Sequence, residues 1–314
     1  MQEWKKLGRI WAPDKTLWWQ QQYAQLPTVL PSANPDVIRV YVGSTDAGNN
    51  ARPGYLELDA NDPIKVLNVT KEPVAELGAP GAFDDSGLVP SSFIVEDDHI
   101  KMYTVGYQRT EKRPYMLLPG LLISKDGGET FERYSEAPII PRQKRAPWSL
   151  AAPFALKDES APKDTRYKMW LWVARKWVKI EGKAYLSAYL GFASSADGID
   201  WRLQDKPAID IKAGEFSLGR PSVHHLANGT WEMYYSVRWV DKLYRLGYAT
   251  SEDGINWTRR DDELQGLDVS PEGWDSEMVC YPAVIRVNNR TFMFHNGNSN
   301  GKTGFGVAEM IETH

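Results

Sequence analysis

Proline-containing apolar stretches recur along the chain at a nearly constant interval, and this repeat limits the possible folds more than any other feature of the sequence. Their prolines are Pro27, Pro90, Pro153, Pro221 and Pro282, so successive copies lie 63, 63, 68 and 61 residues apart. A strand-like segment follows each proline, such as IKMYTVG or YKMWLWVAR, with its central aromatic residue 12 to 17 positions after the proline. Short strands repeated at this period are typical of β-propellers, whose blades normally hold four antiparallel strands.

Five such units account for the 314 residues. The fifth unit ends at GFGVAEMIETH with room for three strands, whereas LGRIWA near the N-terminus supplies a spare strand-like segment. Pairing that segment with the last unit would remove an exposed sheet edge, which closed β-architectures avoid. The sequence therefore predicts an all-β chain, a five-bladed β-propeller closed by the N-terminal strand, as a single domain over residues 1–314. A two-domain β-sandwich is the alternative.

A second repeated element, SADGIDW at residues 195–201 and SEDGINW at residues 251–257, follows the third strand of its unit. In such a turn the Asp side chain accepts hydrogen bonds from nearby backbone N–H groups, and the glycine tolerates a positive φ. We therefore interpret Asp126, Asp197 and Asp253 as structural residues on the face opposite an axial ligand.

Charge and composition argue against several classes of function. The formal net charge is −4 with no basic run, which argues against a nucleic-acid partner. The N-terminus lacks an apolar signal region and no run of about 18 apolar residues occurs, so we predict a cytoplasmic protein without a membrane span. The single cysteine, Cys280, fits a reducing compartment. No HExxH or CxxC spacing occurs, so we expect neither a metal nor a cofactor.

In a propeller, the starts of the first strands and the ends of the second strands converge on the axis. Two of the five positions that precede a repeat proline by five residues are carboxylates, Asp85 and Glu277. Glycoside hydrolysis uses such a pair, one carboxyl group protonating the leaving oxygen and the other activating water or attacking carbon. We expect Glu277, which precedes an apolar strand, to be the acid and Asp85 the base, in an inverting arrangement. Arg220, directly before Pro221, would bind substrate or tune Glu277.

These residues also have structural interpretations. Asp85 lies in GAFDDSGLVP, where it could cap a turn, and Glu277 could form an ion pair with Arg220. Around them, the expected rim is polar and aromatic, which suits a sugar that stacks on rings and takes directed hydrogen bonds. The candidate substrate-binding residues are Gln22, Gln25, Asp84, Trp148, Tyr107, Arg109, Arg175, Trp177, Arg238, Trp239, Tyr281, His295 and Asn296.

The five units, the unit starts FDDSGLVP and SEMVCYP, the SxDGxxW turns and the closing HNGNSNGKTGFG resemble the five-bladed β-propeller glycosidases related to glycoside hydrolase families 43, 32 and 130. More narrowly, the chain is similar to glycosidase-like proteins of bacterial surface-polysaccharide clusters and to the N-terminal domain of plant glucosamine inositolphosphorylceramide transferases. The resemblance implies a carbohydrate-active enzyme in polysaccharide biosynthesis. In families 43 and 32 a first-blade Asp supplies the base or nucleophile, and this chain has Gln22 and Gln25 there. Glu277 comes from the fifth unit instead of the third, where this chain reads APWSLAAP.

Three functions follow as hypotheses. The first is a glycoside hydrolase acting on a glycosidic or glycosyl-phosphate bond through Asp85 and Glu277. The second is a phosphorylase or glycosyltransferase that holds phosphate or an activated sugar, with Arg109, Arg175, Arg238 and His295 as its contacts. The third is a non-catalytic sugar-binding propeller, which the missing first-unit carboxylate favours. In each case the expected partner is a small carbohydrate or an activated sugar.

Overall fold

Strands form almost all of the regular structure in the computed structural model, which describes residues 1–32, 34–113 and 115–311. This confirms the prediction of an all-β chain. Two eight-stranded sheets and one five-stranded sheet hold the described strands. The only helical turns in these ranges are short: η1 (Lys163–Thr165), η2 (Asp261–Glu263) and α1 (Asn298–Gly301).

The three sheets follow the order of the chain. The first eight-stranded sheet contains β2 (Gln22–Leu30), β3 (Val37–Thr45), β4 (Ala51–Asp59), β5 (Val66–Val69), β6 (Gly87–Val95), β7 (Ile100–Gln108), β8 (Met116–Ser124) and β9 (Glu132–Arg133). The second contains β10 (Leu150–Lys157), β11 (Tyr167–Ile180), β12 (Lys183–Ser195), β13 (Arg202–Leu203), β14 (Glu215–His225), β15 (Trp231–Trp239), β16 (Arg245–Ser251) and β17 (Thr258–Arg259). The five-stranded sheet contains β18 (Leu264–Gln265), β1 (Gln2–Trp11), β21 (Phe305–Ile311), β20 (Arg290–Asn296) and β19 (Cys280–Val287).

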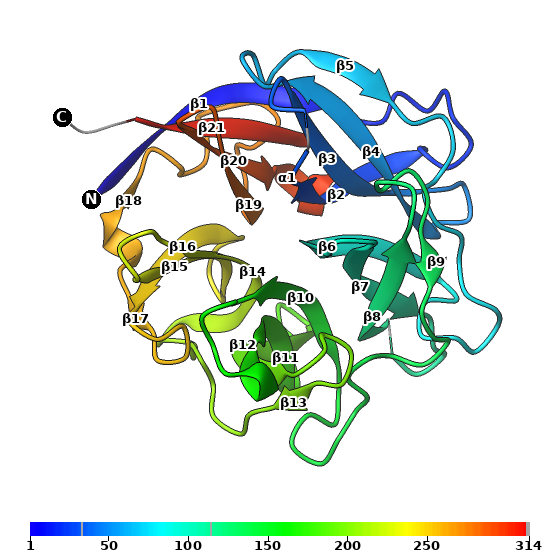
Figure 1. The fold of residues 1–314 in the computed structure, drawn as a ribbon, viewed down its shortest axis with the longest axis vertical. Helices are drawn as coiled ribbons and strands as arrows, with labels where there is room; N and C mark the ends of the chain where they lie inside the picture. The colour runs from blue at the N-terminus through cyan, green and yellow to red at the C-terminus, as the bar shows by residue number, and fades with distance from the viewer. Residues whose placement is uncertain (33, 114, 312–314) are drawn as a thin grey trace.

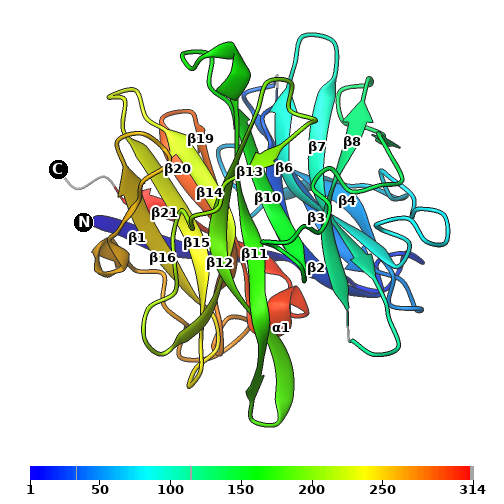
Figure 2. The same cartoon turned by 90° about the horizontal axis from the view of Figure 1, so that it is seen from below.

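Each eight-stranded sheet divides into two antiparallel groups that meet at a single parallel bridge. The bridge joins Ala51 to Gly87 in the first sheet and Ala188 to Ser217 in the second. In the remaining sheet β1 runs antiparallel to β21, with Trp4 opposite Met310. Figure 1 shows these groups arranged around a common centre, with β2, β6, β10, β14 and β19 innermost. Figure 2 shows the strands running between two faces, with α1 and the β11–β12 hairpin at one of them.

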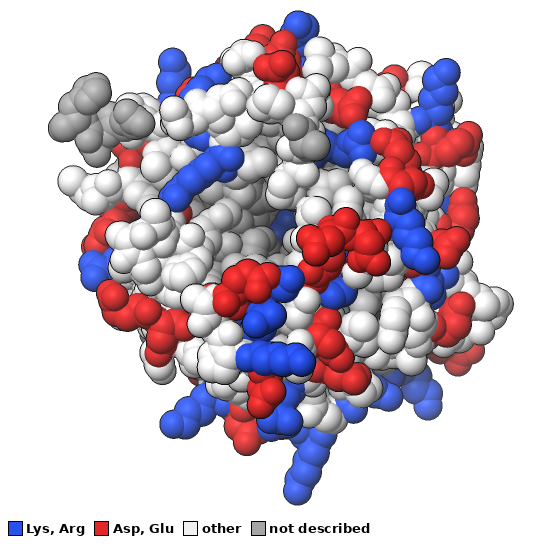
Figure 3. Space-filling model, in the orientation of Figure 1, with Lys and Arg blue, Asp and Glu red and all other residues white. Residues whose placement is uncertain are grey.

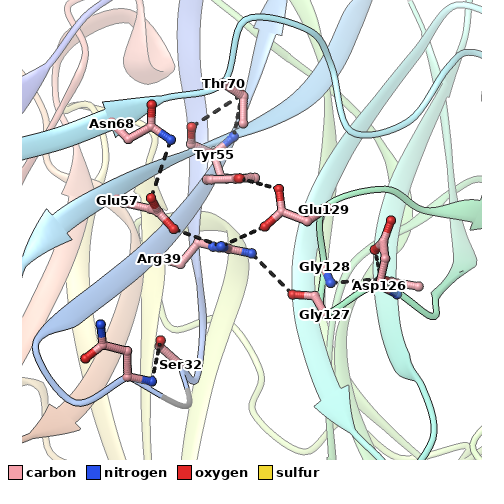
Figure 4. A network of polar contacts seen from close by, with 12 residues as sticks. Ser32, Arg39, Tyr55, Glu57, Asn68, Thr70, Asp126, Gly127, Gly128 and Glu129 are labelled. Carbon is pink, nitrogen blue, oxygen red and sulfur yellow. Dashed lines mark hydrogen bonds and ion pairs between the residues drawn. The ribbon is translucent and has the colours of Figure 1, made fainter.

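Polar side chains join neighbouring groups at their outer edges. Arg39 on β3 contacts Glu57 at 2.8 Å and Glu129, from the turn after β8, at 2.9 Å. The same guanidinium group donates to the carbonyl oxygen of Gly127, and the Tyr55 hydroxyl donates to Glu129 at 2.6 Å (Figure 4). This network ties the β2–β5 group to the β6–β9 group.

The repeated SxDG turns serve the same purpose. Ser251 Oγ accepts hydrogen bonds from the N–H groups of Asp253 and Gly254, and the φ of Gly254 is 73°. The carbonyl oxygen of Gly254 in turn accepts a hydrogen bond from Trp170 Nε1, at 2.8 Å, on the second strand of the preceding group. Tyr103 donates to Gly198, and Tyr41 to Gly128, in the same way. The aromatic residue of one repeat therefore fastens the turn of the next, which supports the structural interpretation of these turns.

Replacing Asp253 with Ala is expected to lower the free energy of unfolding by about 1–2 kcal/mol, because the Asp253 carboxylate accepts hydrogen bonds from the N–H groups of Ile255 and Asn256. Partial burial acts to raise the pKa of Asp253, but these N–H donors outweigh it and lower that pKa to about 2. Urea unfolding measures the loss. Glu252, the residue before Asp253, is exposed, so Glu252→Ala serves as the control and should change the free energy of unfolding by less than about 0.5 kcal/mol. Equal stability of the two variants would contradict the structural interpretation.

None of the helices in the described ranges is long and apolar enough to cross a membrane. The cytoplasmic location stays a prediction.

Candidate functional site

A cavity of about 250 Å³ lies among the innermost strands, at the end of the molecule where α1 lies. We call it the axial cavity. Its polar and aromatic lining residues are Gln25, Tyr107, Tyr115, Trp172, Ser217, Arg220, Arg238, Tyr244, Tyr281 and Asn300. No Asp or Glu occurs among the described residues that line it.

A second cavity, of about 380 Å³, is lined by the later halves of the same inner strands. Its lining includes Phe93 on β6, His224 on β14 and Arg286 on β19. Figure 3 shows the molecule hollowed near the centre of the view. Arg220 lines both cavities, so its side chain lies between them along the axis.

A β-bulge at the residue before the proline directs side chains into the axial cavity. The residues directly before four of the repeat prolines, Leu26, Ala152, Arg220 and Tyr281, have φ values of 51°, 47°, 47° and 58°. The pairing register shifts at each of these positions, as in a β-bulge. A residue before proline normally stays extended, and a left-handed conformation there is strained. All four residues line the axial cavity, so the bulge turns their side chains toward the axis.

Arg220 is almost completely buried, with 1% of its surface exposed. Its Nη2 donates to the carbonyl oxygen of Pro27 and to Thr28 Oγ1, each at 2.9 Å, whereas its Nε has no hydrogen-bond partner among the described residues. Burial lowers the pKa of Arg220 to about 9. Its hydrogen-bond acceptors are neutral, and the ion pair with Glu277 that the sequence suggested does not form. The guanidinium charge is therefore buried without a carboxylate partner, which is energetically unfavourable.

Arg238, on β15, lies among aromatic rings. Its guanidinium carbon is 4.3 Å from the ring centre of Tyr185 and 5.0 Å from those of Phe216 and Tyr244. Burial raises the pKa of Tyr244, and likewise that of Tyr281, so these phenols keep their protons at neutral pH. The cavity therefore combines two cationic groups with neutral hydroxyl donors.

The predicted acid and base do not reach this cavity. Asp85 is half-buried and caps a turn, accepting hydrogen bonds from Gly81 N–H at 3.0 Å and from Ser86 Oγ at 2.7 Å. Glu277 is exposed. Neither residue lines the axial cavity, so the expected convergence of both carboxylates with Arg220 on one pocket is wrong. The physical reason is that β6 begins only at Gly87 and β19 only at Cys280, which leaves both carboxylates in the preceding loops.

Asp84, also predicted to contact substrate, is fully buried away from the cavity. Its carboxylate receives hydrogen bonds from Nε and Nη2 of Arg133, the latter at 2.8 Å. Asp84 therefore holds β9 against the start of β6 as half of a buried ion pair.

Besides Asp84, four more of the thirteen predicted substrate-binding residues lie outside the lining of the axial cavity and make contacts within the fold. Trp148 Nε1 donates to the carbonyl oxygen of Arg175, and the Arg175 side chain pairs with Asp210 at 2.8 Å. His295 is fully buried and stacks on Trp274, with ring centres 5.1 Å apart. Asn296 is also buried, and its Nδ2 donates to the carbonyl oxygen of Ala24 at 2.6 Å.

The remaining predicted residues divide between the axial cavity and its surroundings. Gln25, Tyr107, Arg238 and Tyr281 line it, whereas Gln22, Trp177 and Trp239 do not. Arg109 lines an adjoining cavity of about 230 Å³, which shares Gln25, Tyr107 and Tyr115 with the axial cavity.

Sequence reasoning missed several lining residues, among them Tyr115, Trp172 and Tyr244. Tyr115 directly precedes β8, and Tyr244 directly precedes β16, so both occupy the start of the third strand of their groups. Comparing this position between the repeats could have identified the pair.

Comparisons with known proteins place the chain. No protein-family model matches it. It is 35% identical over 306 residues to "Uncharacterized protein MT1551" of Mycobacterium tuberculosis (strain CDC 1551 / Oshkosh), covering 97% of this chain and 98% of the relative. The same figures hold for "Uncharacterized protein Rv1502" of Mycobacterium tuberculosis (strain ATCC 25618 / H37Rv).

Solved structures show the fold. A protein titled "Glycoside hydrolase" superposes with a TM-score of 0.75 at 16% identity, covering 98% of this chain and 90% of its own. A "thermostable family-43 glycoside hydrolase" gives 0.67 at 14% identity, covering 96% and 93%. A structure titled "The GH130 family of mannoside phosphorylases contains glycoside hydrolases that target beta-1,2 mannosidic linkages in Candida mannan" gives 0.70 at 13% identity, covering 98% and 93%. The fold is thus that of glycoside hydrolase-like propeller proteins, and by sequence the chain belongs to the family of the mycobacterial proteins MT1551 and Rv1502.

Proposed function

We propose that the protein is a carbohydrate-active protein that holds a sugar in the axial cavity. The observation that carries the proposal is the lining itself. Trp172 and four tyrosines offer ring faces and hydroxyl groups beside the amides of Gln25 and Asn300. Such a mixture stacks on the apolar face of a sugar and hydrogen-bonds its hydroxyls. The likeness of fold to proteins titled as glycoside hydrolases supports the same class of ligand.

We further propose that the chain forms one domain, a five-bladed propeller whose last blade is completed by β1. The antiparallel groups that start at β2, β6, β10 and β14 would be four blades, and β19, β20 and β21 with β1 the fifth. The antiparallel register of β1 against β21 supports this proposal.

Hydrolysis is the second candidate activity, because several structures of the same fold are titled glycoside hydrolases. An inverting mechanism needs two carboxyl groups about 6.5–9.5 Å apart around the scissile bond. The lining of the axial cavity provides none, so Asp85 and Glu277 could act only on a sugar that extends over the loops before β6 and β19. The cavity therefore favours sugar binding, or transfer chemistry without this pair, over hydrolysis. A role in polysaccharide biosynthesis stays a prediction.

Replacing Trp172 with Ala is expected to weaken sugar binding at least about tenfold, because the substitution removes the largest ring face in the axial cavity. A glycan array identifies the sugar, and calorimetric titration then compares the variants. Trp18→Ala is the matched control, since Trp18 is exposed and does not line the cavity, and it should bind like the wild type.

The wild type, Asp85→Asn and Glu277→Gln should be assayed for released reducing sugar on the glycans that bind. Loss of turnover in both variants would establish hydrolysis by this pair. Absence of binding to every carbohydrate on the array would refute the proposed function.

A further inference from the structure

We propose that the axial cavity binds an anionic group, a phosphate or a carboxylate, between the guanidinium groups of Arg220 and Arg238. The proposal rests on the proposed function only in so far as the anionic group belongs to a sugar. It specifies the ligand as a charged carbohydrate, such as a sugar phosphate or a uronic acid.

The first support is the contrast with two partly buried arginines elsewhere in the fold. Arg133 pairs with the buried Asp84 at 2.8 Å, and Arg259 pairs with the buried Glu215 at 2.7 Å. Arg220 and Arg238, by contrast, form no ion pair with any carboxylate in the described part of the chain. The fold thus pairs these two guanidinium groups with carboxylates, and it leaves the buried Arg220 and the partly buried Arg238 without a carboxylate partner on the same cavity.

The second support is the arrangement of hydrogen-bond donors. Arg220 Nε is buried and has no partner among the described residues. Arg238 is surrounded by the rings of Tyr185, Phe216 and Tyr244, which pack against the guanidinium group without neutralising its charge. The protonated phenols of Tyr244 and Tyr281 add neutral donors beside these cations. Phosphate and carboxylate oxygens are the acceptors that match guanidinium groups in geometry and charge.

The third support is the volume of the axial cavity and the positive charge of its lining. Its volume of about 250 Å³ is just below the range of about 300–1,000 Å³ that is usual for sites of drug-sized ligands, which suits one sugar ring with its charged group. With no carboxylate in its lining, the cavity attracts an anion and has nothing to repel it.

The decisive experiment is calorimetric titration at constant ionic strength with inorganic phosphate, glucose 1-phosphate, glucuronate and neutral methyl glucoside. Arg238→Gln is expected to weaken phosphate binding at least about tenfold, and Arg238→Lys, which keeps the charge but loses the planar fork, is expected to weaken it less. Arg175→Gln is the matched control, because Arg175 lies outside the cavity and pairs with Asp210. The phosphate affinity of Arg175→Gln should stay within about twofold of that of the wild type.

Arg220→Gln should weaken phosphate binding as well, with thermal unfolding used to verify that the variant folds. Because Arg220 also links β14 to β2 through Pro27, Arg238 is the variant that decides the outcome if Arg220→Gln does not fold. Equal phosphate affinity of the wild type and Arg238→Gln overturns the proposal, as does the absence of binding by all three anionic probes at about 10 mM.

The two proposals fail in different ways. Binding of neutral sugars on the array, unaffected by Arg238→Gln and without any anion binding, leaves the proposed function standing and refutes the anion site. The opposite result is phosphate binding that depends on Arg238, with no binding to any carbohydrate. That result supports the anion site and refutes the proposed function.

Discussion

Acidification from about pH 6.5 to about pH 4 is expected to lower the free energy of unfolding by about 3 kcal/mol through His295 alone. Burial, aided by the nearby Lys6, lowers the pKa of His295 to about 4, against an opposing effect of Asp275. The unfolded chain binds a proton as the pH falls through about 6.5, whereas the folded protein resists it until about pH 4. The contribution of His295 to stability is therefore complete above about pH 6.5 and is lost between these two values.

The surroundings of His295 explain the size of this effect. The side chain is fully buried and stacked on Trp274, and neither ring nitrogen has a hydrogen-bond partner among the described residues. A proton on this ring would thus add a buried charge whose N–H groups have no hydrogen-bond acceptor, and the attraction of Asp275 offsets only part of that cost. His224 acts in the same direction, because burial and Arg286 lower its pKa to about 4.

Urea unfolding between pH 4.5 and pH 7 measures this dependence, and His295→Phe isolates the residue because it keeps a flat ring and removes the titrating group. We expect the variant to be more stable than the wild type by about 2–3 kcal/mol at pH 4.5, and to lie within about 1 kcal/mol of it at pH 7. His225→Phe is the matched control, since His225 is exposed while stacked on Trp231, and it should keep the pH dependence of the wild type. If His295→Phe also keeps that dependence, the assignment to His295 is wrong.

Replacing Asp84 with Asn is expected to destabilise the fold by about 3 kcal/mol, because the change leaves the Arg133 charge without its partner. The Asp84 side chain is 0% exposed and that of Arg133 15% exposed, so water can replace little of the lost interaction. Asp85→Asn is the control on the adjacent carboxylate, which is half-buried and caps a turn, and it should lower stability by less than about 1 kcal/mol.

The double variant Asp84→Asn/Arg133→Met tests the cause. If the unpaired guanidinium group is responsible, the double variant should be more stable than Asp84→Asn alone. A double variant that loses the sum of both single effects would show that Asp84 and Arg133 do not act as a pair.

The strands and the structural turns could be predicted from the sequence because their requirements are local. The aromatic residue of each strand, at Tyr41, Tyr103 and Trp170, recurs 13 to 17 positions after its proline, and each bonds to the turn of the next repeat. The SxDG turns are recognisable because hydroxyl, carboxylate and glycine must stand at fixed spacing to bond the backbone around them. These features recur in the amino-acid sequence because the backbone of each unit adopts the same turn.

The composition of the cavity was decided by the tertiary structure. Arg220 and Tyr281 reach it because a bulge with positive φ turns the residue before the proline inward, and no single repeat read alone shows this conformation. Tyr115 and Tyr244 reach it from the third strands, and Asp85 and Glu277 are left outside because their strands begin two and three residues after them. The sequence by itself determined where strands and turns form, through spacings of a few residues. Which side chains meet at the axial cavity depends on contacts between residues far apart in the sequence, such as Arg220 and Pro27 at a separation of 193 residues, and therefore only the tertiary structure decided it.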